Sequence, residues 1–371
     1  MIRKFLQKIF KTVSYSFFLK IHGKIIESIT CENDHRIEVK TINDEKNLKY
    51  NIYKINNGRL YTDRIHDTAI LLDNKIIKEP SFQLRYKAAS EIYNSKIEDN
   101  VVFTKGTPRI LKNLKGKVLS MLTGGGANNN YWHWLFDVLP RLGLCSRHIN
   151  LEEINYFLLP SLLRNFQNET LDCLNIPMNK RLSSEKFRHI KANELIVTDH
   201  PVVVTGNVSK DMQNMPSWIM QWLKKNFIRE NKNNNKKNRI YIDRKDTKYA
   251  NLRTIANEKE VKNYLLENDF ISLNLGDINF SKQVELFNNA DCIAGLHGAG
   301  FANIVFCQTG TKVIEFRSLN AGPVIENLAN INNLNYHSIV KEDTPIQKYG
   351  FPNQQGSIEI PIDQLSEMLK N

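Results

Sequence analysis

Two residues whose side chains can exchange protons, His133 and Asp137, lie four positions apart in a largely apolar segment. Residues at this spacing fall on one face of a helix, so both side chains can act on one substrate. Burying a carboxylate costs free energy, so Asp137 is expected to have a specific role. Its structural alternative is an ion pair with Arg141, one turn on. We predict that Asp137 is a general base and that His133 orients it or replaces it as the base.

A glycine-rich turn, Gly295-Leu-His-Gly-Ala-Gly300, follows an apolar strand and opens a predicted helix. Such glycines let backbone N–H groups turn toward an anion at the positive end of a helix, although the same turn can be purely structural. The spacing G-x-x-G-x-G reverses the dinucleotide fingerprint, and no Lys-Ser/Thr pair makes it a Walker loop. His297 lies inside the turn and can donate to a phosphate oxygen or carry a proton. We therefore predict a phosphate site made by Gly295, His297, Gly298, Ala299 and Gly300.

Three charged residues flank this turn. Arg244 and Lys245 end the strand that opens this half of the chain, and they add two cations unless they are simply solvated. Glu315 lies near the end of the strand after the turn, where it could accept hydrogen bonds from a ribose diol or pair with Arg317 or another cation. Together with the turn, they predict a pocket for a nucleotide diphosphate. No D-x-D occurs in the sequence, so we expect no essential metal.

The elements that must position these residues alternate regularly after Gly116. Predicted strands cover residues 117–122, 156–159, 195–198, 239–244, 271–275, 292–295, 313–316 and 336–340. Predicted helices cover residues 131–145, 162–174, 217–228, 258–266, 281–289, 299–306, 324–330 and 362–369. This alternation indicates parallel sheets wrapped by helices, an α/β fold. We expect two doubly wound Rossmann-type halves that face a central cleft, with ligands at the carboxyl ends of the strands.

The predicted domains follow from shifts in composition. Residues 1–28 form a basic amphipathic helix, 29–230 a first α/β domain, and 239–345 a second α/β domain, with a C-terminal tail and helix at 346–371. Residues 231–238 are polar and are predicted to be the linker. Between Glu32 and Asp99 the pattern indicates only short strands and polar turns.

The N-terminal segment has an apolar face and a lysine-rich face. At 100° per residue its apolar side chains fall within an arc of about 140°. They are Ile2, Phe5, Leu6, Ile9, Phe10, Val13 and Phe17. The uncharged stretch is far shorter than the roughly 20 residues that span a bilayer. The pattern favours contact with an anionic membrane surface, and packing on the protein is the alternative.

Composition bounds the class of protein. The 371 residues include 51 Lys and Arg and 39 Asp and Glu, a net charge of +12 that favours anionic partners. With 41% hydrophobic residues the chain is neither wholly disordered nor a polytopic membrane protein. Its five cysteines contain no C-x-x-C pair, which indicates neither a zinc site nor a disulfide framework and fits a reducing compartment.

Four separated segments carry a family resemblance: Tyr131–Leu142, Arg239–Arg244, Ala290–Asn303 and Val313–Phe316. In order and content they resemble glycosyltransferase family 61, most of all its bacterial capsule-type members. The resemblance implies a GT-B-like fold, an inverting mechanism and a nucleotide-sugar donor held by the second half, and it adds Asn303 to the predicted donor site. Phe301 departs from the Leu that is common in the family after the H-G-A-G turn.

The sequence therefore predicts an inverting, metal-independent glycosyltransferase without a cofactor. Its donor is a nucleotide-sugar, expected to be UDP-linked, and its acceptor a hydroxyl of a capsule- or lipopolysaccharide-type glycan or glycolipid. We expect it in the cytoplasm, on the inner face of the cell membrane, with no nucleic-acid partner. The alternatives are a non-catalytic basic protein that binds nucleic acid or membrane, and a dinucleotide-dependent oxidoreductase, which the reversed glycine spacing disfavours.

Overall fold

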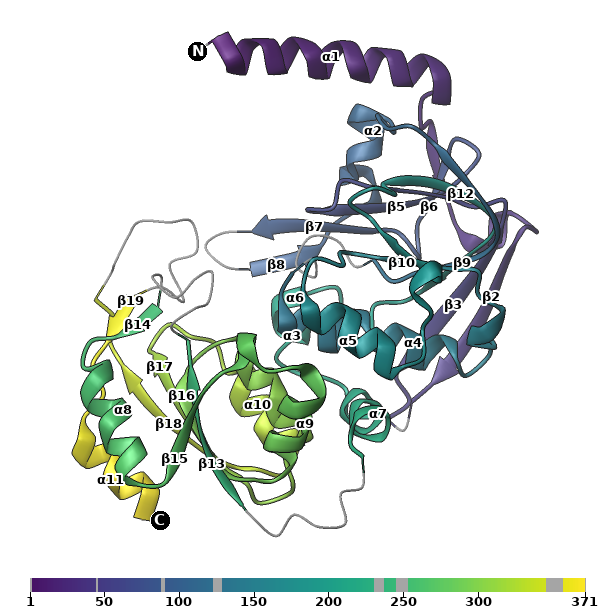
Figure 1. The fold of residues 1–371 in the computed structure, drawn as a ribbon. Helices are drawn as coiled ribbons and strands as arrows, with labels where there is room; N and C mark the ends of the chain where they lie inside the picture. The colour runs from purple at the N-terminus through teal and green to yellow at the C-terminus, as the bar shows by residue number, and fades with distance from the viewer. Residues whose placement is uncertain are drawn as a thin grey trace. The chain divides into compact units, whose positions relative to one another are not determined.

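The computed structural model describes residues 2–44, 46–87, 91–122, 129–229, 237–244, 253–344 and 356–370. The chain divides into two compact units (Figure 1). The first comprises Met1–Tyr86, Ile92–Gln167 and Asn175–Val208, and the second comprises Lys87–Glu91, Asn168–Leu174 and Ser209–Asn371. Most of the expected linker, 231–236, lies outside the described residues, and the domain boundaries given above stay a prediction.

The second unit contains a five-stranded parallel sheet in the order β15-β13-β16-β17-β18. Its strands are β13 (Asn238–Asp243), β15 (Phe270–Asn274), β16 (Ala290–Leu296), β17 (Lys312–Ser318) and β18 (Asn335–Lys341). A short parallel pair, β14 (Arg253–Ile255) and β19 (Gly356–Ile358), joins the end of the chain to this unit. The parallel order agrees with the alternation of strands and helices in the sequence.

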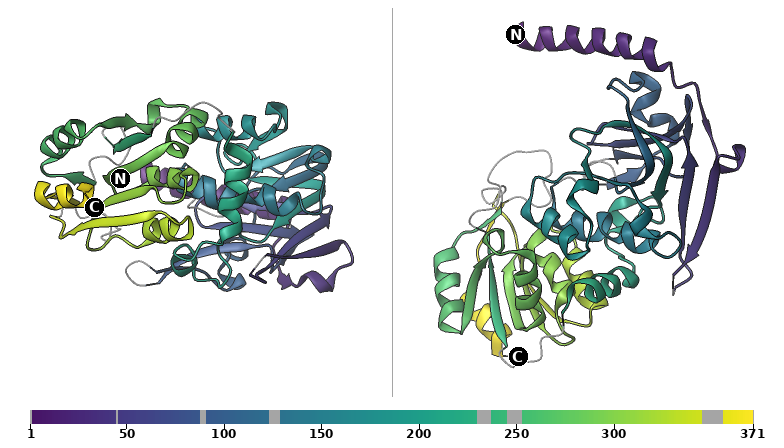
Figure 2. Two further views of the ribbon diagram at one scale, coloured as in Figure 1. Left: turned by 90° about the horizontal axis from the view of Figure 1, so that it is seen from below. Right: turned by 45° about the vertical axis from the view of Figure 1, so that its right-hand side comes forward.

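Helices cover both faces of this sheet (Figure 1). Helices α8 (Glu258–Glu267) and α11 (Ile362–Lys370) lie on one face, and α9 (Phe280–Asn288) and α10 (Val324–Ile331) lie on the other. Figure 2 shows these layers from other directions. A 3-10 helix, η10 (Ala299–Phe306), follows β16. Helix α7 (Ser217–Phe227) also belongs to this unit, because the Phe227 ring contacts the rings of Phe280 and Phe306. The sheet is therefore doubly wound.

The first unit has a different sheet, with twelve strands of mixed direction. Strand β12 (His189–Thr198) is parallel to β9 (Lys112–Ser120) and antiparallel to β3 (Lys49–Asn56) and β4 (Arg59–Thr62). Strands β12, β9, β10 (Tyr156–Leu159) and β11 (Arg181–Ser183) form a parallel block, and β1 (Glu27–Ile29) and β6 (Lys75–Ile77) form a separate parallel pair. The other strands are β2 (Ile37–Asn43), β5 (Asp67–Leu72), β7 (Phe82–Lys87) and β8 (Glu91–Asn94).

This mixed sheet corrects the expectation of a doubly wound first half. Consecutive strands here pair antiparallel, as β2 does with β3, β4 with β5 and β5 with β6. A short turn can join antiparallel strands, whereas consecutive parallel strands need a long crossover connection. Asp73, for example, adopts a φ of 52° in the two-residue turn between β5 and β6. The predicted GT-B-like pairing of two such halves across a cleft stays a prediction.

Helices α3 (Tyr131–His133) and α4 (Pro140–Cys145) lie beside the parallel block (Figure 1). Helix α2 (Val101–Lys105) packs instead on the antiparallel strands, where Val102 shares a core with Tyr61 and Leu71. The next helices along the chain are α5 (Asn165–Cys173) and α6 (Val208–Asp211). Helix α5 runs from the first unit into the second, and α6 ends in the second.

Helix α1 (Ile2–His22) is the expected N-terminal helix. Its C-terminal end is held by His22, whose Nε2 lies 2.9 Å from the Arg109 carbonyl oxygen. The side chains of residues 2–11 lie outside the description, so the amphipathic pattern is followed only from Thr12 onward. There Val13, Phe17 and Ile21 are 62%, 57% and 57% exposed. Among the described residues no helix is long and apolar enough to cross a membrane.

Candidate active site

A π-turn, Trp134–Val138, interrupts the helix that carries Asp137. The N–H of Leu139 donates to the carbonyl of Trp134 at 3.0 Å, five residues back. Pro140 follows, and because it has no N–H it cannot continue the regular helical ladder. Single π-turns inside helices are frequent at functional sites. The turn places Asp137 in the protein interior, where it is 4% exposed.

The structure pairs Asp137 with His133. Nδ1 of His133 lies 2.7 Å from Oδ2 of Asp137, and the His133 side chain is 23% exposed. Burial opposes ionisation of Asp137, but its interactions with His133, His200 and Arg141, including the hydrogen bond of His133, outweigh burial and lower the pKa of Asp137. Nε of Arg141 donates to the backbone oxygen of Asp137 at 3.2 Å, and Nη1 donates to the Thr198 carbonyl. The carboxylate is therefore the partner of His133 and not of Arg141.

His200, which the sequence analysis missed, also faces this carboxylate. Its Nδ1 accepts the N–H groups of Val202 and Val203 at 3.1 and 3.0 Å. These bonds fix the neutral tautomer with hydrogen on Nε2, which lies 4.0 Å from Oδ2 of Asp137. Burial lowers the pKa of His200 to about 3. No spacing in the sequence links His200 to Asp137, because they meet only through the fold.

In the second unit, His297 is held by a fully buried carboxylate. Nδ1 of His297 donates to Oε1 of Glu315, and the Tyr336 hydroxyl donates to Oε2 at 2.5 Å. Glu315 is 0% exposed, so both its oxygens are engaged inside the protein. This corrects the prediction that Glu315 accepts hydrogen bonds from a ribose. The alternative partner, Arg317, instead contacts Glu326 at 3.9 Å.

Two arginines converge on the backbone at the start of the glycine turn. Nη1 of Arg244 and Nη1 of Arg253 both donate to the carbonyl of His297, the latter at 3.0 Å. Burial lowers the pKa of both, that of Arg253 to about 10, with the neighbouring Arg244 as a second cause. A Cβ on Gly298 would lie 2.0 Å from Nη1 of Arg244, so a side chain at this position would displace the guanidinium. The sequence analysis did not predict Arg253, because this residue lies on β14, away from every motif, and reaches the glycine turn only in the folded chain.

The remaining predicted donor-site residues build the turn. Gly295 and Gly300 pack closely on Ile242, to which added Cβ atoms would come within 3.0 and 3.2 Å. Asn303 is buried, and its amide donates to Gln283 at 2.9 Å and to the Gly300 carbonyl at 3.3 Å. Asn303 therefore has a structural role in this motif, since its side chain is buried in the core.

Ala299 and Lys245 are the two remaining residues of the predicted donor site. Ala299 is the first residue of η10, so its N–H has no partner within the helix. Lys245 lies outside the described residues.

Within the described part of the chain, no three His, Cys, Asp or Glu side chains gather as metal ligands, and all five cysteines are free.

Comparison with known proteins identifies a domain that contains the His133–Asp137 pair and the glycine turn with its two arginines. Residues 131–314 match the family model Glycosyltransferase 61. The match begins at α3, two residues before His133, and ends inside β17, beyond the glycine turn. No curated protein matches the chain. The chain therefore carries a glycosyltransferase 61 domain, and the protein is a glycosyltransferase.

Proposed function

We propose that this glycosyltransferase is an inverting enzyme that needs no metal. It transfers a sugar from a nucleotide-sugar, UDP-linked in our proposal, to a hydroxyl of a capsule- or lipopolysaccharide-type glycan or glycolipid of a bacterial cell. The observation that carries this proposal is the pair of clusters within one matched domain: a His–Asp pair in a π-turn and a histidine turn braced by two arginines. A single displacement needs these two functions, a base and a cationic site for the leaving group.

The geometry favours His133 as the base, with Asp137 as its positioning residue. Asp137 is buried and occupied by Nδ1 of His133, whereas His133 is partly exposed. In this arrangement Nε2 of His133 takes the proton of the acceptor hydroxyl while the acceptor oxygen bonds to the anomeric carbon. The carboxylate of Asp137 stabilises the imidazolium that forms, as the aspartate does in a Ser-His-Asp triad. The proposal thus adopts the alternative stated in the sequence analysis, in which His133 is the base.

The second cluster supplies positive charge for the leaving group. When the bond from the anomeric carbon to the diphosphate breaks, its electron pair stays on the phosphate oxygen. His297, with its Nδ1 donating to Glu315, has Nε2 remaining to face the diphosphate. Arg244, Arg253 and the N–H groups that open η10 add donors. These fixed cations replace a divalent metal in the proposed mechanism.

Helix α1 supports the proposed location on the inner face of the cell membrane. Val13, Phe17 and Ile21 are exposed on α1, and Lys20 lies in its last turn. Apolar side chains next to lysines fit the interface of an anionic leaflet. Membrane contact would place the enzyme at a membrane-bound glycan acceptor.

A nucleotide-release assay tests the proposed function. Purified full-length protein is incubated with UDP-, GDP- and CMP-linked sugars, with and without cell-envelope glycan as acceptor. We expect release of UDP that depends on acceptor, survives EDTA and gives a product of inverted anomeric configuration by NMR. Release that requires a divalent ion would refute the metal-free mechanism. Retention of configuration would refute single displacement, and no nucleotide release from any donor would refute the donor assignment.

A further inference from the structure

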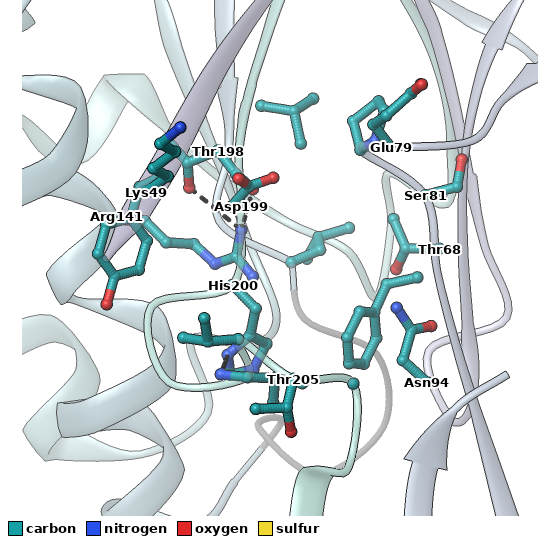
Figure 3. Close-up of a pocket in the computed structure, with 18 residues that line it drawn as sticks. Lys49, Thr68, Glu79, Ser81, Asn94, Arg141, Thr198, Asp199, His200 and Thr205 are labelled. Carbon is teal, nitrogen blue, oxygen red and sulfur yellow. Dashed lines mark hydrogen bonds between the residues drawn. The ribbon is translucent and has the colours of Figure 1, made fainter. Parts of the chain in front are cut away.

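A pocket of about 350 Å³ lies entirely within the first unit. Its walls come from two separate parts of that unit. Figure 3 shows Arg141, Thr198 and Asp199 on one wall, and Thr68, Ser81 and Asn94 on the wall opposite. Its size is within the usual range for small-molecule sites. Many of the lining residues precede Tyr131 and so lie outside the matched family domain. The family match therefore does not account for the shape of the pocket.

Arg141 and Asp199 offer a donor and an acceptor that are both held rigidly. Nε and Nη1 of Arg141 are hydrogen bonded to backbone oxygens, and Nη2 has no hydrogen-bond partner among the described residues. Asp199 accepts the N–H of Asn51 at 2.7 Å and the hydroxyl of Tyr53 at 2.7 Å. A neighbouring donor and carboxylate suit the hydroxyls of a sugar, because each hydroxyl both donates and accepts. Their fixed positions reduce the entropy lost on binding.

An aromatic surface completes the pocket. The Phe82 ring stacks on the His200 ring, with centroids 5.4 Å apart and planes at 27°. Both residues line the pocket. Phe82 therefore provides an apolar surface for the C–H groups of a sugar ring, and the polar residues provide partners for its hydroxyls.

The charges of the lining favour a neutral ligand. Lys49 and Arg141 are basic, and Glu79 and Asp199 are acidic, so the formal charges of the lining balance. An anionic ligand would meet both carboxylates and gain no net attraction. The pocket thus differs from the cationic cluster at His297, which suits a diphosphate.

The pocket borders Asp137, the residue that positions the proposed base His133. Arg141 donates to the backbone oxygen of Asp137, and His200 lies 4.0 Å from its carboxylate. We infer that this pocket binds a neutral sugar residue of the acceptor and so sets acceptor specificity. The inference rests on the proposed function, since it assigns the acceptor of the same enzyme.

Filling the pocket tests this inference without touching the His133–Asp137 pair. Val203 lines the pocket and contributes its backbone N–H to His200, which Val203→Trp retains. Thr205→Trp, at an exposed lining position, is a second variant in case the first fails to fold. Ile110→Trp is the matched control, because Ile110 is 72% exposed and outside the pocket lining.

The probes are methyl glycosides of neutral hexoses and methyl glucuronide, measured by saturation-transfer NMR on full-length protein. We expect a neutral glycoside to bind the wild type and the Ile110→Trp control, and binding to fall at least tenfold in the filled variants. UDP binding, measured by calorimetry, should be equal in all four proteins. Preference for the glucuronide, or undiminished binding in a folded filled variant, would overturn the inference. Absence of glycoside binding with UDP binding intact would overturn it too, whereas loss of UDP binding in the wild type would count against the proposed function.

Discussion

Oδ2 of the buried Asp137 lies 2.7 Å from Nδ1 of His133, so the carboxylate holds the imidazole by the nitrogen nearer the helix backbone. Asp137 itself is 4% exposed, and its Oδ1 is buried without a hydrogen-bond partner in the described part of the chain. A substrate hydroxyl reaches the partly exposed histidine more easily than this carboxylate. This geometry supports the proposal that His133, and not Asp137, exchanges a proton with the substrate.

The first prediction concerns this pair. His133→Gln should lower the rate of sugar transfer by about 10² to 10⁴, the usual contribution of a positioned general base. Asp137→Asn should also slow transfer and should move the acid limb of the pH–rate profile to lower pH, because the imidazolium loses its carboxylate partner. UDP affinity should not change in either variant. Steady-state kinetics between pH 5 and pH 9 and calorimetry measure these effects.

An exposed histidine nearby provides the control. His148→Gln makes the same substitution as His133→Gln at a solvent-exposed position, and it should transfer sugar at the wild-type rate. If His133→Gln keeps the wild-type rate while Asp137→Asn loses it, Asp137 is the base, as the sequence analysis predicted.

The second prediction concerns the cations of the glycine turn. Arg253→Ala or His297→Ala should weaken UDP binding by 1.5 to 3 kcal/mol, or roughly 10- to 150-fold, because each removes one charge-assisted hydrogen bond. Lys259→Ala, which removes an exposed cation from α8, should leave affinity unchanged. Calorimetric titration with UDP compares the three. Equal affinities would exclude both residues from the donor site.

The third prediction concerns Gly298. A Cβ at this position would lie 2.0 Å from Nη1 of Arg244, so Gly298→Ala must displace the guanidinium from the His297 carbonyl. UDP affinity should fall, while the melting temperature changes by only a few degrees. Gly322→Ala is the control, because its Cβ would meet no atom within 4 Å. Wild-type UDP affinity in Gly298→Ala would show that the position of Arg244 does not matter for binding.

Local sequence patterns predicted most elements, and long-range pairing explains the exceptions. Strand Tyr156–Leu159 and the start of the helix at Glu258 are where the apolar pattern predicted them. Between Glu32 and Asp99 the pattern predicted short strands but not their order in a sheet, because partners such as β12 for β3 are far away in the sequence. The mixed direction of that sheet follows from this pairing.

The same limit applies to the site. His133, Asp137 and His297 belong to local motifs, so their types and spacing made them candidates. Arg253 lies on a separate strand and meets the turn only in the folded chain. Glu315 was identified, but its role was wrong, because the sequence does not show that Tyr336 and His297 enclose it.

The fourth prediction concerns α1. Deletion of residues 1–19 should release the protein from vesicles that contain anionic lipid and leave transfer to a soluble acceptor intact. The double variant Val13→Glu, Phe17→Glu should do the same while keeping the helix, because it places charge on exposed apolar positions. Cosedimentation with vesicles measures binding, and neutral vesicles provide the control. Equal cosedimentation of all three proteins would refute membrane contact through α1.

The last prediction concerns acid stability of the first unit. Burial lowers the pKa of His189 to about 4 and that of His200 to about 3, from 6.5 in the unfolded chain. Below about pH 6.5 the unfolded chain therefore binds more protons than the folded chain. The free energy of unfolding consequently decreases as the pH is lowered. His200→Asn keeps an acceptor for the N–H groups of Val202 and Val203 but does not titrate. Urea unfolding of this variant should lose roughly 2 kcal/mol less than wild type between pH 6.5 and pH 5. His148→Asn, at an exposed site, should follow wild type, and parallel curves for His200→Asn and wild type would show that His200 is not buried in its neutral form.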